Sequence, residues 1–177
     1  MQLPRWMGGA GLCAALLLAA GAARAETKVE LKGVHLCCGN CTKTVGEILS
    51  KVDGVKGACD RQAKTVTITA PDAKTAQKAV DALAAAGFHG QTDSKEVTIK
   101  EDSGAKKGKA KTVTVSGAHN CCQMCCKALK ETVKKVDGVT ADTAQPKADT
   151  FEVTGDFDAA ALVKALNDAG FHVKVKK

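Results

Sequence analysis

Aromatic residues are scarce in this sequence. It contains no tyrosine, one tryptophan and four phenylalanines, so aromatic residues make up 3% of the 177-residue chain. Proteins that bind single-stranded nucleic acid stack its bases on aromatic side chains, and this chain offers few. Its net charge of +7 comes largely from one lysine-rich stretch, which we interpret as a contribution to solubility. We therefore expect no nucleic-acid partner.

The motifs of common enzyme classes are missing as well. The sequence has no carboxylate pair placed for acid–base catalysis, no Ser/His/Asp order and no glycine-rich phosphate loop. These absences argue against a hydrolase or a kinase. We predict that the protein is not an enzyme.

No apolar run reaches the ~20 residues that a membrane-spanning helix needs. The longest, residues 8–20, follows Arg5 and precedes the small residues Ala23 and Ala25. A positive start, a short apolar core and an A-x-A ending are typical of a secretory signal peptide. We predict a signal peptide over residues 1–25, export to the periplasm or the extracellular space, and no membrane span after cleavage.

Cysteine, by contrast, is abundant. Seven of the nine cysteines lie in two tight clusters, at 37–41 and 121–126. A disulfide framework would spread its cysteines along the chain, since bridges between near neighbours remove little chain entropy. Clustering therefore favours metal or redox chemistry.

The sequence is also duplicated. Three blocks recur in the same order and at nearly constant spacing: residues 33–41 as 117–125, 51–55 as 135–139, and 86–89 as 169–172. Such self-similarity indicates a repeated domain. We predict metal-binding domains at residues 26–94 and 111–177, joined by a flexible linker at 95–110 that is rich in lysine and glycine.

Each repeat has the pattern strand, helix, strand, strand, helix, strand. Val29 and Leu31 alternate with charged residues, as in a strand. The second helix of each repeat ends at a glycine, Gly87 or Gly170. The order predicts the α+β class: two tandem ferredoxin-like βαββαβ domains, each a four-stranded antiparallel sheet with two helices on one face.

Each cysteine cluster falls where the first strand of a repeat leads into its first helix. The unpaired N–H groups and positive dipole of a helix N-terminus stabilise thiolates. Cys38 and Cys41 form one C-x-x-C pair, and Cys122 and Cys125 form the other. Two such thiolates can hold one soft ion, such as Cu(I) or Zn(II).

These pairs, with the Val-Asp-Gly-Val and Ala-Gly-Phe blocks, resemble the heavy-metal-associated (HMA) domain family over nearly all of the chain after residue 25, twice. That family includes copper chaperones and periplasmic mercuric-ion-binding proteins. The resemblance implies a module that binds a soft transition-metal ion, Cu(I) or Zn(II) before Hg(II), and passes it to a metal transporter or another metallochaperone. The loop is longer here than the family's usual Gly-Met-x-Cys-x-x-Cys, with Val34 and Ala118 replacing the methionine.

The longer loop supplies further candidate ligands. Cys37 and Cys121 are third thiolates or halves of vicinal disulfides, and Cys126 is a ligand or only a helix residue. His35 and His119 are ligands or supports for ligands. His89 and His172 line the site or start an edge strand. Two cysteines and two histidines would satisfy zinc. The candidate ligands are Cys37, Cys38, Cys41, Cys121, Cys122, Cys125, Cys126, His35, His119, His89 and His172.

Two functions are consistent with these features. The first is an exported carrier, buffer or scavenger of soft metal ions, in which each domain holds an ion or both domains face one ion. The alternative is a thiol–disulfide oxidoreductase that uses the C-x-x-C pairs.

Overall fold

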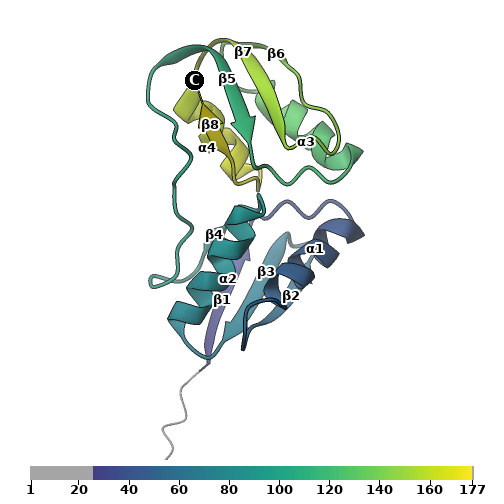
Figure 1. Ribbon diagram of the computed structural model, residues 1–177, viewed down its shortest axis with the longest axis vertical. Coiled ribbons are helices and arrows are strands. Elements are labelled where there is room, and N and C mark those ends of the chain that lie inside the picture. Colours follow the sequence, from purple (N-terminus) through teal and green to yellow (C-terminus); the bar gives the residue numbers. More distant parts are fainter. Residues whose placement is uncertain (1–25, 177) are drawn as a thin grey trace, which may run out of the picture.

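The computed structural model describes residues 26–176, so the predicted signal peptide lies outside the described residues. Two βαββαβ units follow one another along the chain and lie end to end (Figure 1). The N-terminal domain contains β1 (Thr27–Lys32), α1 (Gly39–Leu49), β2 (Lys56–Asp60), β3 (Thr65–Ala70), α2 (Ala73–Ala85) and β4 (Gln91–Thr92). The C-terminal domain contains β5 (Lys109–Ser116), α3 (Gln123–Val133), β6 (Val139–Asp142), β7 (Thr150–Asp158), α4 (Ala159–Asp168) and β8 (Lys174–Lys176).

The two sheets have the same topology. Their strand orders are β2-β3-β1-β4 and β6-β7-β5-β8, and all pairings are antiparallel. In each domain both helices cover one face of the sheet (Figure 1). This arrangement confirms the predicted pair of ferredoxin-like domains.

Apolar side chains at helical spacing hold the helices on the sheets. In the N-terminal domain, Val45 and Leu49 of α1 and Val80 and Leu83 of α2 are buried against Ile68 of β3 and its neighbours. A separate core fills the C-terminal domain. Within residues 26–176, no helix has both the length and the apolar character needed to cross a membrane.

The segment between the domains is held in place over much of its length, whereas the sequence predicted a flexible linker at 95–110. The reason is that it carries anchoring groups among its lysines. Val97 is fully buried in the N-terminal core. The backbone N–H and the carbonyl of Thr98 both form hydrogen bonds with the side-chain amide of Gln77. Ser103 accepts a hydrogen bond from the backbone of Val175 at 2.8 Å, and β5 already begins at Lys109.

The domains meet through the Ala-Gly-Phe-His blocks, in a nearly twofold-symmetric way. The backbone N–H groups of His119 and His172 donate to the Gly87 carbonyl at 3.3 and 3.0 Å. In return, those of His35 and His89 donate to the Gly170 carbonyl at 3.5 and 3.0 Å.

Glycine is required at the centre of this interface. Gly87 and Gly170 have φ angles of +85° and +89°, where other residues are strained. A Cβ on Gly87 would overlap the backbone of residues 117–119, and one on Gly170 would overlap that of residues 33–35. The two interdomain turns are thus packed backbone against backbone, which brings the loops that follow β1 and β5 together.

Candidate metal centre

The cysteine loops begin where the sequence predicted. Cys38 and Cys122 are the N-cap residues of α1 and α3, with extended backbone at φ −150° and −156°. Cys41 and Cys125 follow within the first turn of each helix. The helix N-termini therefore direct their unpaired N–H groups and positive dipole ends toward the sulfurs.

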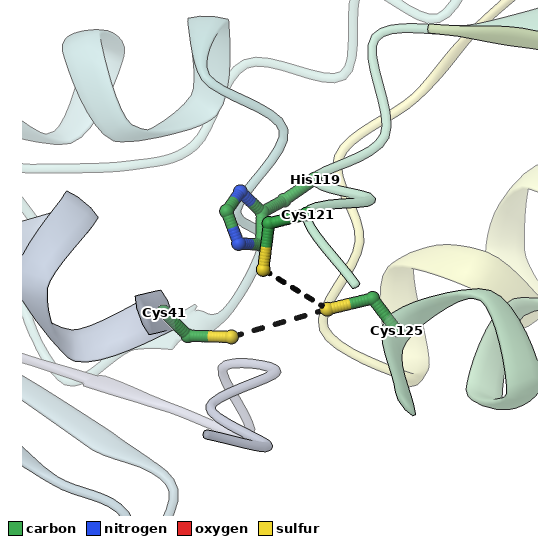
Figure 2. Close-up of side chains that lie close together, drawn as sticks. All are labelled: Cys41, His119, Cys121 and Cys125. Atoms are coloured by element: carbon green, nitrogen blue, oxygen red, sulfur yellow. Dashed lines mark hydrogen bonds between the residues drawn. The ribbon is translucent and has the colours of Figure 1, made fainter. Parts of the chain in front are cut away.

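The two loops face each other across the domain interface and form one cluster of six sulfurs, which we call the six-cysteine cluster. Within the loops, neighbouring Sγ atoms are 3.6–3.8 Å apart. Between the loops, Cys37 lies 3.4 Å from Cys125 and 4.0 Å from Cys122, while Cys41 lies 3.9 Å from Cys125 and Cys38 lies 4.0 Å from Cys122. Figure 2 shows the sulfurs of Cys41, Cys121 and Cys125 converging. The members of the cluster are Cys37, Cys38, Cys41, Cys121, Cys122 and Cys125.

The cluster has a buried centre and a partly open rim. Cys41 and Cys125 have no exposed surface, and the other four cysteines are half-buried. All six are free thiols rather than vicinal disulfides. The centre is closed to solvent, but a small ion or an incoming thiol can reach the rim.

His35 and His119 border the cluster. Each ring stacks on the phenylalanine of the other domain: His35 on Phe171 at 4.3 Å and His119 on Phe88 at 4.1 Å between centroids. The Nε2 atoms of both rings are buried without a hydrogen-bond partner. Nitrogen atoms left unpaired in this way beside sulfur are suited to ligate a metal or to donate to a thiolate.

One histidine completes a four-ligand set. A ring nitrogen of His119 and the sulfurs of Cys41, Cys121 and Cys125 all lie within 4.8 Å of one another (Figure 2). On the other side of the pseudo-twofold axis, His35 forms a smaller group with Cys37 and Cys125. Burial lowers the pKa of His35, which keeps its ring neutral and able to bind a metal.

The thiol protons are held unequally. The hydrogen bond from Cys125, with a further one from His119, lowers the pKa of Cys41 to about 2. The same contact with Cys41, together with burial, raises the pKa of Cys125. The contact between the two central sulfurs thus favours the thiolate at Cys41 and the protonated thiol at Cys125.

The rim thiols also differ from one another in pKa, according to their position in the cluster. Burial raises the pKa of Cys37, and it raises the pKa of Cys121 to about 12. The backbone N–H of Cys125 lowers the pKa of Cys122 to about 7. A cluster of six thiols can release most of its protons only if a cation replaces them.

Three candidate ligands lie elsewhere. The His89 and His172 rings stack nearly parallel at 5.8 Å, and their Nε2 atoms contact Glu101 at 3.3 Å and Asp102 at 3.0 Å. Cys126 is buried in the C-terminal core. None of these three belongs to a candidate metal group among residues 26–176. Cys59 is half-buried in β2.

Two features of this region are not readable from sequence motifs. Glu101 and Asp102 lie in the presumed linker, and Glu101 also accepts a hydrogen bond from Asn167 of the other domain at 3.0 Å. The second feature is the joining of the two cysteine loops, which is one of the two arrangements that the sequence left open. The sequence signal that accompanies it is the recurrence of the Ala-Gly-Phe-His block, at residues 86–89 and 169–172, in both repeats.

The sequence model of the heavy-metal-associated domain matches residues 112–172, which make up most of the C-terminal domain. Among solved structures, the chain is similar to the N-terminal soluble domains of Bacillus subtilis CopA, with 14% identity, a TM-score of 0.30, and coverage of 86% of this chain and 95% of that one. It is also similar to the water-soluble region of the P-type ATPase CopA from Bacillus subtilis, with 15% identity, a TM-score of 0.29, and coverage of 86% and 93%. No curated protein matches the sequence.

Proposed function

We propose that this protein is an exported carrier, buffer or scavenger of soft metal ions, of the class of Cu(I), Zn(II) and Hg(II), and that both domains hold the cargo in one shared site. The observation that carries the proposal is the six-cysteine cluster itself. Sulfurs from two loops far apart in sequence lie 3.4–4.0 Å from one another, without a disulfide among them.

The spacing of the sulfurs fits ligands that share an ion. For Zn–S bonds of about 2.3 Å in a tetrahedron, the ligand sulfurs are separated by roughly 3.8 Å. The C-x-x-C pairs have Sγ separations of 3.7 and 3.8 Å. Thiolate and imidazole donors select soft and borderline ions over magnesium or calcium. The match of residues 112–172 to the heavy-metal-associated domain supports the same reading.

The partly open rim supports transfer rather than permanent storage. Cys38 and Cys122 are half-buried, so a thiol of a metal transporter or of another metallochaperone can reach them. Metal exchange between thiolates needs such access, since the incoming sulfur binds before the outgoing one leaves. Export rests on the signal-peptide pattern of residues 1–25. We expect the chain recovered from the exported compartment to begin at Glu26, which N-terminal sequencing and intact mass would establish.

The metal content of the chain purified from that compartment, with a count of its free thiols, tests the proposal. We expect bound copper or zinc, and loss of at least half of any bound copper in the double variant Cys38→Ser plus Cys122→Ser. The matched control is Cys59→Ser plus Cys126→Ser, which removes two thiols outside the cluster and should retain the metal. A reduced chain that binds neither copper, zinc nor mercury would overturn the proposal.

One observation favours the second candidate, a thiol–disulfide oxidoreductase. Cys122 is an accessible N-cap thiol with a pKa lowered to about 7, in a C-x-x-C pair with Cys125, and such thiols can attack disulfides. The test is reduction of a disulfide-bonded protein substrate by the reduced, metal-free chain. Catalytic turnover abolished by Cys122→Ser, in a chain that binds no soft ion, would put this function first.

A further inference from the structure

Building on the proposed function, we infer that the six-cysteine cluster is a cage for a polynuclear Cu(I)–thiolate cluster of about four ions rather than for a single ion. In such a cluster the ions are shared between the domains, in contrast to one ion in each C-x-x-C pair.

The contacts among the six sulfurs have the connectivity of an octahedron. Eight Sγ pairs lie 3.4–4.0 Å apart. Four more Sγ pairs lie within 4.8 Å, as members of the same candidate metal groups: Cys37–Cys38, Cys38–Cys121, Cys41–Cys121 and Cys121–Cys122. Together these are the twelve edges of an octahedron in which every sulfur has four neighbours and one opposite partner. The opposite pairs are Cys37 and Cys121, Cys38 and Cys125, and Cys41 and Cys122.

An octahedron of sulfurs has a natural capacity for trigonal ions. Four of its eight faces can be chosen so that no two share an edge and every sulfur belongs to two of them. One ion on each such face gives about four ions, each bound by three sulfurs, with every thiolate bridging two ions. Three of these faces coincide with candidate metal groups; the four are Cys37/Cys38/Cys41, Cys38/Cys121/Cys122, Cys41/Cys121/Cys125 and Cys37/Cys122/Cys125.

The surroundings of such a cluster favour its net negative charge. Six thiolates with about four Cu(I) ions leave a net charge of about −2, far below that of the bare thiolates. The N-termini of α1 and α3 both begin at the cluster and favour negative charge. The unpaired Nε2 atoms of His35 and His119 can donate hydrogen bonds to cluster sulfurs.

Zinc would need more ligands per ion than Cu(I) in the same cage. A tetrahedral ion on a face needs a fourth ligand from outside, and His119 supplies one for Cys41, Cys121 and Cys125. His35 would do the same for the related face, so that about two zinc ions would share Cys41 and Cys125. That arrangement leaves Cys38 and Cys122 unused, although each lies 3.7–4.0 Å from its neighbours. A trigonal ion on each chosen face uses all six sulfurs without any ligand from outside, which is why we assign the cage to Cu(I).

Titration of the reduced full chain with Cu(I) under anaerobic conditions tests this inference, with stoichiometry read by native mass spectrometry. We expect about four copper ions per chain, taken up together. The copper X-ray absorption spectrum should show about three sulfurs per copper, and a copper–copper scattering path that a mononuclear site lacks. The proposed function would survive a stoichiometry of one or two without copper–copper scattering, but this inference would not. No binding at all would sink both.

Cysteine variants separate the cage from its surroundings. Because each thiolate bridges two ions, Cys38→Ser should lower the stoichiometry by about two. Cys38 is half-buried, so the variant should fold, and circular dichroism would check this. Cys126→Ser, beside the cage in sequence but buried in the C-terminal core, should keep about four ions. Loss of copper in both variants would refute the octahedral assignment.

The two histidines discriminate copper from zinc. In the double variant His35→Gln plus His119→Gln, we expect zinc binding to fall more than copper binding, because the histidines are ligands for zinc but not for copper in this arrangement. The opposite result, about two zinc ions that displace copper and depend on both histidines, would overturn the assignment to Cu(I).

Discussion

Replacing Gly170 with alanine separates domain docking from domain folding. Gly170 is buried at the interface, with φ +89°, and its carbonyl accepts the interdomain hydrogen bond from His35 at 3.5 Å and that from His89 at 3.0 Å. An alanine Cβ there would overlap the backbone of residues 33–35. Since backbone on both sides cannot yield as a flexible side chain would, we expect the domains to separate at this point.

Two contributions lower the free energy of unfolding in Gly170→Ala. Alanine in the left-handed region costs about 1–2 kcal/mol. Loss of the two hydrogen bonds to the Gly170 carbonyl costs about 1 kcal/mol each. Gly117→Ala is the matched control, because Gly117 has φ +83° but open space around its Cβ position. We therefore expect Gly170→Ala to be destabilised by about 2 kcal/mol more than Gly117→Ala.

Two measurements check the effect. Denaturant unfolding gives the free-energy difference between the variants, and small-angle scattering gives the radius of gyration. We expect Gly170→Ala to be larger in radius and to lose the shared metal site, whereas Gly117→Ala keeps both. If Gly170→Ala retains the native radius and the full metal stoichiometry, the interdomain contact through Gly170 does not position the cysteine loops.

Three further predictions concern other parts of the molecule. Val97→Ala, in the segment between the domains, should lower the free energy of unfolding by about 2 kcal/mol by opening a cavity, measured by urea titration; an effect near zero would mean that the segment is not docked. In the metal-free chain, the rate of alkylation of Cys122 should rise with pH and reach half its maximum near pH 7, because its thiolate forms above that pKa. Cys121 should stay unmodified at neutral pH, because its pKa is raised to about 12. Peptide mass spectrometry distinguishes the two sites. Asp158→Ala should cost about 1 kcal/mol, since its side chain caps α4 at 2.9 and 3.0 Å, and unfolding at the wild-type midpoint would contradict that role.

The fold was predictable because each repeat carries its own local signals. The alternation of Val29 and Leu31, and the glycine stop at Gly87, are dictated by residues within a few positions of one another. The anchoring of the segment between the domains was not predictable, for a related reason. The prediction of flexibility rested on the average composition of residues 95–110. The burial of Val97 depends instead on one side chain packing into the N-terminal core.

The shared site was beyond the reach of sequence spacing. Cys41 and Cys125 were both predicted as ligands, but no periodicity relates two residues that meet only when domains dock. The contact that brings them to 3.9 Å is made by backbone at Gly87 and Gly170, and backbone contacts leave no side-chain pattern. The sequence therefore identified the cysteines that form the cluster, and left open whether each domain holds an ion or both domains face one.

In the proposed shared site, domain docking and ion binding are coupled, because the site exists only when the two loops meet. An ion that binds the docked form alone stabilises it by about 4 kcal/mol at a free concentration 1,000 times its Kd. Linkage is reciprocal, so whatever pulls the domains apart weakens ion binding by the same factor. Cys41 and Cys125 are fully buried while Cys38 and Cys122 are partly open. We therefore expect exchange with a partner thiol to begin at Cys38 or Cys122, and the last bonds to break only as the domains separate.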